Sequence, residues 1–272
     1  MIQKVFLMAG LTLMSASQLP AVLSVTGSGT YNYTQNFDTL AQSSSGNAWA
    51  NDSTLNGWFL YQKSGSGSVA VTSYGASAGP SVGGFYSLGT DSSSERALGA
   101  VGSSAFEGWI AVAFANNSGS TVNSFTVGFD GEQWRNSKAG PQTMVLQYGL
   151  GSTFETVSSW ISPGGTFDWT SPVTGGTSSV SGIGNTSGLV AGVGGTINSL
   201  AWNNGSTLWI RWIEADDSGS DHAMAIDNFS FTTIVPVPEP ATSALWVGVG
   251  LGGFAMWRLG AGWLRRQHEA KG

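Results

Sequence analysis

The stretch Trp109-Ile110-Ala111-Val112-Ala113-Phe114 places a large apolar side chain at every second position. Phe125, Val127 and Phe129 repeat this alternation a short distance along the chain. A period of two sends alternate side chains to opposite faces of a strand, so one face of each stretch is expected in a core. Further strand candidates are residues 143–148, 154–161, 207–213 and 223–233. The pattern predicts an all-β fold, a single antiparallel β-sandwich of the jelly-roll type.

The segments between these strands are rich in turn-forming residues. Glycine accounts for 40 and serine for 39 of the 272 residues, whereas only 10% of residues are charged. Aromatic residues make up 11%, which is typical of a folded core and not of a disordered chain. Turns are expected at Ser118-Gly119, Asn204-Gly205, Ser218-Gly219 and Pro163-Gly164-Gly165. We interpret the Gly/Ser tracts at 64–84 and 173–195 as long loops over one domain, residues 25–234.

The charge of the body excludes one class of partner. Residues 25–240 carry five basic and 15 acidic side chains, a net charge of −10. Such a body repels phosphate backbones, so no nucleic-acid partner is expected. The chain contains no cysteine, which excludes disulfides and thiolate metal sites.

The N-terminus has the pattern of a secretory signal peptide. Lys4 precedes an apolar run at residues 5–14, and small residues follow. The apolar run is too short to cross a bilayer by itself. Cleavage is expected after Ser17 or Ser24, and we assign residues 1–24 to the signal peptide, which makes the protein an exported one.

The C-terminus combines three features in a fixed order. Val237-Pro238-Glu239-Pro240 is stiffened by proline, and the apolar residues that follow lack charge up to Trp257. Arg258 interrupts the run before Arg265-Arg266 closes it. We predict a transmembrane helix at about 241–264 and a cytoplasmic basic tail at 265–272, with the body outside.

This end of the chain resembles the PEP-CTERM sorting signal of Gram-negative bacteria. The motif 237–240, the apolar span and the basic Arg258, Arg265 and Arg266 carry the resemblance, which covers residues 235–272. It implies an inner-membrane precursor recognised by an exosortase, a membrane cysteine protease-transpeptidase. It further implies a mature protein at the cell surface or in an extracellular matrix associated with exopolysaccharide.

The last predicted hairpin, from Leu208 to Phe231, resembles that of extracellular jelly-roll modules of the MAM-like and carbohydrate-binding types. Asn36-Phe37-Asp38 resembles their first strand. In several such modules, carboxylates of the first and last strands share a structural cation. By this resemblance Asp38 and Asp227 are the expected metal ligands, with Ca²⁺ as the expected ion.

No catalytic signature stands out in the body. Asp216, Asp217 and Asp221 offer hard oxygen ligands for Ca²⁺ or form a solvated turn. His222 is the one histidine outside the C-terminal tail, and no nucleophile-elbow motif accompanies it. Residues 130–135 are expected to form a hairpin turn. The carboxylates that could pair for glycoside hydrolysis are those of Glu107, Asp130, Glu132, Glu155 and Asp168.

We therefore expect a non-catalytic cell-surface or exopolysaccharide-matrix protein. Two alternatives remain open on the same sorting signal: a secreted polysaccharide hydrolase or lyase, and a carbohydrate-binding module. Exposed aromatic rings would favour sugar binding, because an aromatic face suits the C–H surface of a sugar. The candidates for this role are Trp49, Trp58, Trp134 and Trp169.

The sorting motif yields a testable prediction. Replacing Pro238, Glu239 and Pro240 by alanine should leave the full-length precursor in the inner membrane, because the extended, protease-accessible segment is lost. Mass spectrometry of surface and membrane fractions measures the result. Normal release of the triple variant would refute the motif's role, and recovery of peptides from 259–272 joined to the surface-located body would show simple anchoring.

Overall fold

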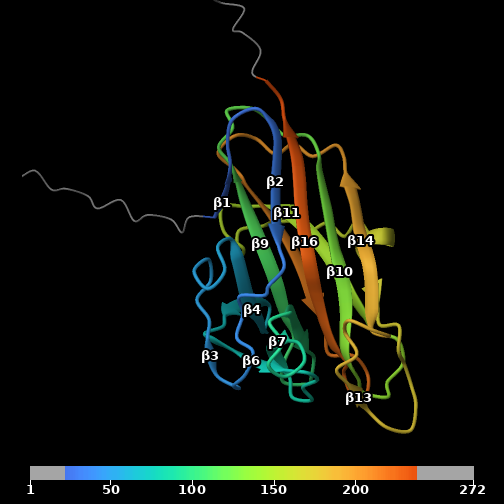
Figure 1. The fold of residues 1–272 in the computed structure, drawn as a ribbon. Helices are drawn as coiled ribbons and strands as arrows, with labels where there is room; N and C mark the ends of the chain where they lie inside the picture. Colours follow the sequence, from blue (N-terminus) through green and yellow to red (C-terminus); the bar gives the residue numbers. More distant parts are fainter. Residues whose placement is uncertain (1–21, 238–272) are drawn as a thin grey trace, which may run out of the picture.

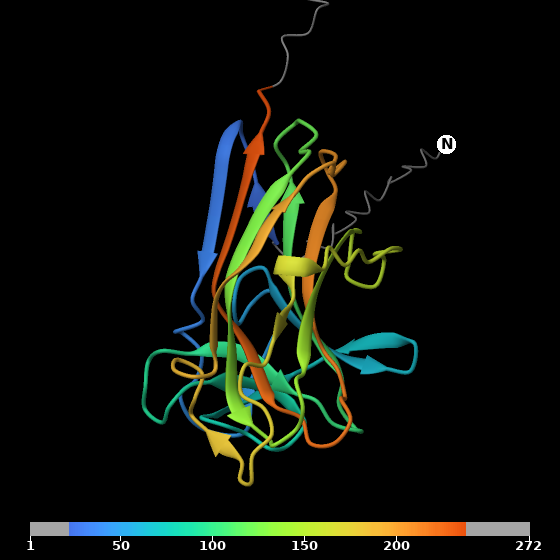
Figure 2. The ribbon, with the colours of Figure 1, turned by 90° about the vertical axis from the view of Figure 1, so that its right-hand side faces the viewer.

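The computed structural model describes residues 22–237, which form two β-sheets packed face to face (Figure 1, Figure 2). A core of buried apolar side chains fills the space between the sheets. The first sheet has seven strands. Their order is β12 (Trp169–Thr170), β11 (Thr143–Leu150), β15 (Thr207–Glu214), β9 (Gly108–Asn116), β4 (Trp58–Ser64) and β5 (Gly67–Ala70), with β1 (Leu23–Val25) added along β9.

The second sheet has nine strands. The main path is β13 (Val180–Ser181), β10 (Phe125–Asn136), β16 (Ala223–Val235), β8 (Ala97–Val101), β7 (Gly84–Leu88), β6 (Ser73–Ser77) and β3 (Asn47–Ala48). Beside this path, β14 (Leu189–Ile197) pairs with β10, and β2 (Gly29–Gln35) pairs with β16.

The all-β, two-sheet prediction is confirmed, with one correction to its antiparallel character. Strand β1 pairs with β9, and β6 with β7, in parallel. Within residues 22–237 the one helical element is a 3₁₀ turn, η1 (Gly165–Phe167). No helix in that range is long and apolar enough to cross a membrane. The predicted transmembrane helix, the basic residues, and the sorting motif from Pro238 onward lie outside the described residues, as do residues 1–21.

Period-two alternation assigns the two faces of the central strands. In β9, Ile110, Val112 and Phe114 point into the core between the sheets, whereas Ala111 and Ala113 belong to a separate cluster on the outer face. Phe125, Val127 and Phe129 of β10 are likewise buried in the core. Residues 109–114 and 125–129 thus form the expected strands, and their large alternating side chains Ile110, Val112, Phe114, Phe125, Val127 and Phe129 face the core as expected.

An aromatic layer joins the two sheets. The rings of Phe114 and Phe231 stack with centroids 3.9 Å apart. Trp58 and Trp212 lie nearly parallel at 6.0 Å, and Phe229 presents its edge to both. Aromatic pairs in these geometries contribute about 0.5–1.5 kcal/mol beyond the burial of their area. These five rings, contributed by both sheets, form the centre of the sandwich.

Two local predictions are wrong. Residues 154–161 do not form a strand; only Ile161 makes a bridge, to Tyr148. Phe154 and Val157 are buried because this segment lies flat against the outer face of the first sheet. Residues 130–135 form no hairpin turn but belong to the twelve-residue strand β10.

The Gly/Ser tracts are also more regular than expected. The first contains β5 and β6, and the second contains β13 and most of β14. By contrast, the predicted turns are present. Gly119, Gly205 and Gly219 adopt positive φ angles of 82°, 83° and 101°, a region that glycine enters without the steric cost of a Cβ atom.

The boundaries of the body differ slightly from those predicted. Leu23 and Ser24, assigned to the signal peptide, lie in β1, where Leu23 is buried above Gly57. At the other end β16 reaches Val235, which is 2% exposed. The sandwich therefore uses residues on both sides of the predicted range 25–234.

Replacing Phe231 by alanine should lower the free energy of unfolding by about 3–5 kcal/mol, because it removes a fully buried ring from the aromatic layer. Ile234→Ala is the matched control on the same strand, since Ile234 is 66% exposed. Denaturant unfolding of both variants measures the difference. Equal losses of stability would contradict the placement of Phe231 at the centre of the core.

Candidate functional site

The outer face of the first sheet carries a row of side chains across neighbouring strands. Arg211 of β15 lies opposite Ala111 of β9 on one side and opposite Gln147 of β11 on the other. Trp109 stands two residues along β9 from Ala111, on the same face. Ala111 itself is fully buried, whereas Trp109, Gln147 and Arg211 are half-buried.

The segment after β11 lays aromatic rings onto this face. Phe154 stacks on Tyr61 with centroids 4.2 Å apart and also contacts Trp109 and Trp160. Phe154 is 4% exposed, whereas Trp109 and Trp160 are only partly buried. The aromatic cluster is therefore anchored by a buried ring and presents two indoles at its surface.

Arg211 lies among these rings. Its guanidinium carbon is 3.8 Å from the ring centroid of Trp160 and 5.1 Å from that of Trp109. Its Nε and Nη2 both donate to Oε1 of Gln147, at 2.9 and 2.6 Å. Burial lowers the pKa of Arg211 to about 10, so the group stays protonated at neutral pH. Stacking and hydrogen bonding hold the guanidinium plane in one orientation.

Two adjoining hollows share Trp109 and Arg211 as a common wall. One, of about 340 Å³, is also lined by Trp160, Glu155 and residues 66–68 of the β4–β5 hairpin. The other, of about 200 Å³, is lined by Gln147 and by Lys63 and Glu107, which form an ion pair. We call these two hollows the aromatic groove. Indole faces beside an amide, a guanidinium and carboxylates suit a ligand with both C–H faces and hydroxyl groups.

The tryptophans expected to stack on sugars are not available. Trp49, Trp58, Trp134 and Trp169 are 3%, 0%, 1% and 2% exposed, so that prediction is wrong. Among the tryptophans of residues 22–237, the partly exposed ones are Trp109 and Trp160. The exposure of Trp109 could have been predicted, because it alternates with the core residues Ile110, Val112 and Phe114 and so points away from the core. Nothing in the sequence around Trp160 predicts that this ring is exposed.

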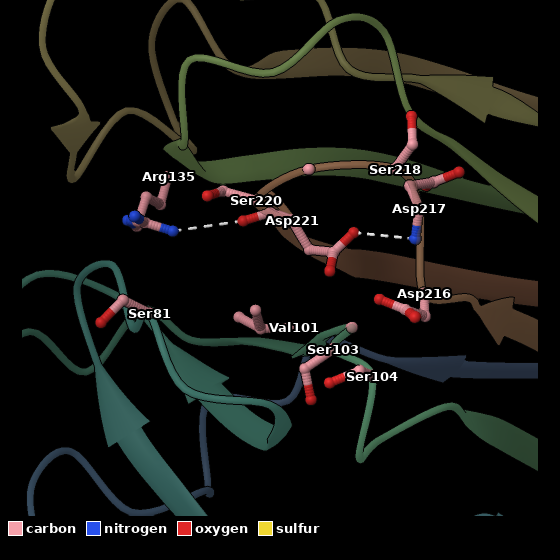
Figure 3. Close-up of a pocket in the computed structure, with 12 residues that line it drawn as sticks. Ser81, Val101, Ser103, Ser104, Arg135, Asp216, Asp217, Ser218, Ser220 and Asp221 are labelled. Atoms are coloured by element: carbon pink, nitrogen blue, oxygen red, sulfur yellow. Dashed lines mark hydrogen bonds between the residues drawn. The ribbon is translucent and has the colours of Figure 1, made fainter.

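A larger hollow, of about 490 Å³, lies beside the acidic turn at residues 216–221 (Figure 3). Asp221 shapes this turn, because its Oδ1 accepts hydrogen bonds from the Asp217 amide and from Nε2 of Gln142. Arg135 closes one side by donating to the Asp221 carbonyl at 3.2 Å. Apart from Val101 and two glycines the lining residues are polar, and none of them is aromatic. The geometry is that of a hydrogen-bonded turn at the molecular surface.

His222 is part of the interior. It is 0% exposed, its Nδ1 accepts from the Ser137 amide at 3.0 Å, and its Nε2 donates to the Gly140 carbonyl at 3.1 Å. Burial lowers its pKa, which favours the neutral ring that these bonds require. Oγ of Ser137 is also near Nδ1, but it donates to the Ser220 carbonyl and is shielded from solvent. The pair fastens two loops and offers no accessible nucleophile.

Asp38 and Asp227, the expected metal ligands, lie in one acidic region on the second sheet. Burial is the main cause that raises the pKa of Asp227, and the charges of Glu95, Asp38 and Asp130 raise it further. The resulting pKa of Asp227 is about 7. Glu95, Glu132 and Asp227 bring carboxylate oxygens within 4.8 Å of one another. Burial raises the pKa of Glu132 to about 8. No spacing or motif in the sequence connects Glu95 or Glu132 with Asp227.

Comparisons with solved structures give distant likenesses, of which two are a carbohydrate-binding module and a glycoside hydrolase. No protein-family model and no curated protein matches the chain. A family 61 carbohydrate-binding module in complex with β-1,4-galactotriose is 12% identical with a TM-score of 0.27, covering 52% of this chain and 72% of that one. An isomalto-dextranase of Arthrobacter globiformis T6 complexed with panose is also 12% identical, with a TM-score of 0.31. That match covers 76% of this chain and 33% of the enzyme. At these TM-scores neither likeness carries an argument about function.

Glu214 links the two sheets and should make stability depend on pH. Its Oε1 accepts the Gly102 amide at 3.0 Å, and it is 5% exposed. Burial, reinforced by the charges of Asp221 and Asp217, raises its pKa well above the ordinary value of 4.5. In the folded state Glu214 therefore keeps a proton that it releases in the unfolded state above about pH 4.5. The free energy of unfolding falls as pH rises from about 4.5 to the raised pKa of folded Glu214.

Glu214→Gln should remove this pH-dependent loss, because glutamine keeps the acceptor for Gly102 and carries no charge. Its stability relative to the natural protein should grow with pH, by at most about 1.4 kcal/mol per pH unit. Denaturant unfolding between pH 5 and 8 measures the difference. Parallel pH dependence of the two proteins would contradict the assignment.

Proposed function

We propose that this protein is an exported, non-catalytic component of the cell surface or of an exopolysaccharide matrix. Its jelly-roll-like sandwich would bind saccharide chains in the aromatic groove. The observation that carries the proposal is the arrangement of Trp109, Trp160, Arg211 and Gln147 along one open face. The PEP-CTERM-like end supports the location, and the groove supports the ligand class.

The groove offers the two kinds of contact that a sugar ring needs. A pyranose presents C–H groups on its faces, which pack on indole rings, and hydroxyls at its rim, which need hydrogen-bond partners. Gln147 and Arg211 are held in place by their mutual hydrogen bonds, so little side-chain entropy is lost when a ligand binds. Such preorganisation favours binding by an open, shallow groove.

The body's charge argues for a ligand of low negative charge. Residues 25–240 contain only five basic residues but 15 acidic ones. Two of the acidic residues, Glu155 and Glu107, line the groove itself. A polyanionic chain would meet repulsion along most of the surface. Neutral saccharide units are therefore the class that we assign to the groove.

Export and sorting complete the proposal. Cleavage after Ser17 would leave β1 intact, whereas cleavage after Ser24 would remove buried Leu23 from the sandwich. At the other end β16 finishes at Val235, two residues before the sorting motif begins at Val237. An exosortase would thus meet its motif directly beyond the folded body, with the inner membrane as the site of the precursor.

One observation favours a second candidate, a polysaccharide hydrolase or lyase. Glu107 and Glu155 border the two halves of the groove, and paired carboxylates carry out glycoside hydrolysis. Against this, the Glu107 carboxylate is already engaged in an ion pair with Lys63. We therefore rank binding without chemistry first.

Trp160→Ala should weaken binding of the host's exopolysaccharide about tenfold, because it removes one stacking face and the platform under Arg211. Arg211→Lys keeps the charge but loses the planar, stacked group, and it should also weaken binding. Trp160→Phe, which retains an aromatic face, should lose less.

Isothermal titration calorimetry of the full chain measures these affinities, with Val82→Ala, at an exposed position outside the groove, as the control. Unchanged affinity in both Trp160→Ala and Arg211→Lys would overturn the groove assignment. A reducing-sugar assay on the same samples distinguishes saccharide binding from hydrolysis. Release of reducing ends by the natural protein that is lost in Glu155→Gln would show that the groove hydrolyses its ligand and would overturn the proposal of binding without chemistry.

A further inference from the structure

Strand β2 forms a border of the second sheet. It pairs with β16 in one continuous register, from the Gly29–Val235 pair to the Gln35–Phe229 pair, and no other strand of residues 22–237 pairs with it. Figure 2 shows β2, in blue, at the margin of the sheet with β16 on its inner side. An antiparallel strand directs its N–H and C=O groups alternately to its two edges, so half of those of β2 point away from β16.

The outward backbone groups of β2 have no backbone partner in the described part of the chain. Apart from the ladder to β16, no N–H or C=O of residues 29–35 hydrogen-bonds to another backbone group within residues 22–237. A row of unpaired groups along a strand edge is a template on which a further strand can add. The free edge of β2 is therefore a candidate surface for strand pairing.

The other long border strand of this sheet, β14, is protected against such pairing, whereas β2 is not. The register of β14 with β10 shifts between Phe129 and Gly131. Gly192 of β14 has a positive φ of 72°, and its amide donates to Asp130 at 2.8 Å. Irregularities of this kind keep a further strand from adding. By contrast, β2 contains no charge, no proline and no register shift.

Packing against the core holds β2 in a fixed extended conformation. The ring of Tyr31 meets Phe114 and Phe231 edge-on, with centroids 6.4 Å apart in both pairs. Tyr33 meets Phe114 at 5.7 Å, and its hydroxyl accepts a hydrogen bond from Nε1 of Trp58 at 2.9 Å. Because the strand is already ordered, little conformational entropy is lost when it pairs with a partner.

The sequence of β2 is palindromic about Asn32, since Thr30-Tyr31-Asn32-Tyr33-Thr34 reads the same in both directions. If two such strands pair antiparallel with Asn32 at the twofold axis, Thr30 lies opposite Thr34 of the second copy, and Tyr31 lies opposite Tyr33. Threonine then meets threonine on the outer face, and tyrosine meets tyrosine on the core-facing side. Such cross-strand pairs stabilise a sheet. The palindrome therefore favours a second copy of this chain as the partner.

The distribution of charge favours the same contact. Residues 25–240 carry a net charge of −10, so two copies repel each other over much of their surface. Residues 22–37 and 228–237, which include β2 and the part of β16 beside it, contain no charged side chain. Two copies can therefore approach each other along this neutral strip with little repulsion.

We propose that two copies of this protein pair antiparallel through their β2 edges, with Asn32 at the twofold axis, and so join their second sheets into one continuous sheet. A self-complementary contact of this kind closes at a dimer. One strand from each copy makes a small interface, below about 1,200 Å², so the dimer should dissociate on dilution. The pairing does not depend on saccharide binding, but the dimer would carry two aromatic grooves, and linked sites bind a repeating polymer more tightly than one site does.

Cysteine cross-linking tests the register, because the natural chain contains no cysteine. Asn32→Cys in the full chain should form a disulfide-linked dimer under mild oxidation, since Cα atoms paired at the axis lie about 4.5–5.5 Å apart. Thr34→Cys is the matched control on the same face. Its two copies would lie four residues out of register, about 13 Å apart, which no disulfide spans. Equal cross-linking of the two variants, or none in Asn32→Cys, would overturn the proposal.

Sedimentation velocity measures the association without a cross-link. In a detergent that disperses the apolar residues 241–257, the natural full chain should show a monomer–dimer equilibrium that depends on concentration. Asn32→Lys should raise the dissociation constant of the dimer at least about tenfold, because it places like charges directly opposite each other at the axis.

Thr126→Lys is the control for this measurement. Thr126 lies on an interior strand of the same sheet, β10, and the substitution removes an exposed hydrogen bond to Thr196, as Asn32→Lys removes one to Thr232. Its dissociation constant should match that of the natural chain. A natural chain that stays monomeric, or equal dissociation constants for all three proteins, would contradict pairing through β2.

Discussion

Strand β16 has to hydrogen-bond along its whole length on one edge while its neighbours on the other edge are two different strands. Its thirteen residues follow β10 on one side and pass from β2 to β8 on the other. Backbone groups at the change of partner cannot all be satisfied by a regular ladder, because two strands cannot occupy the same edge position. The register shift at Asp227 and Asn228 is the local solution, and no basic side chain within residues 22–237 forms an ion pair with the Asp227 carboxylate.

The same register shift keeps the core continuous. Without the extra residue, either Ile226 or Phe229 would face solvent, since side chains alternate strictly along a regular strand. The shift lets Phe229 meet Trp58 and Trp212, and it lets Phe231 stack on Phe114. Packing of the aromatic layer therefore depends on an irregularity whose other consequence is the acidic cluster. The packing of the core and the acidic cluster thus arise from one constraint.

The outer faces of the two sheets have different chemistry. On the first sheet, the segment after β11 covers part of the face with Phe154 and Val157 and leaves Trp109 and Trp160 beside a stacked guanidinium. On the second sheet, Leu88, Trp134 and alanines of β8 and β16 form a small apolar cluster next to the carboxylates. The first sheet thus exposes aromatic and polar side chains, whereas the second sheet buries carboxylates beside an apolar cluster.

Local sequence patterns predicted the strands that alternate cleanly, the turns at glycine, the acidic character of the body and, to within a few residues, the extent of the sandwich. Those features are local, because a period of two or a positive φ is set by neighbouring residues. Three other features depend on the tertiary structure. They are the exposure of each tryptophan, the position of residues 154–161, and the contact of Glu95 and Glu132 with Asp227. Alternation separates the two faces of a strand, but it does not say which face a distant segment will cover. It also does not say which strands become neighbours, and the carboxylates at positions 95, 132 and 227 meet only because β8, β10 and β16 do.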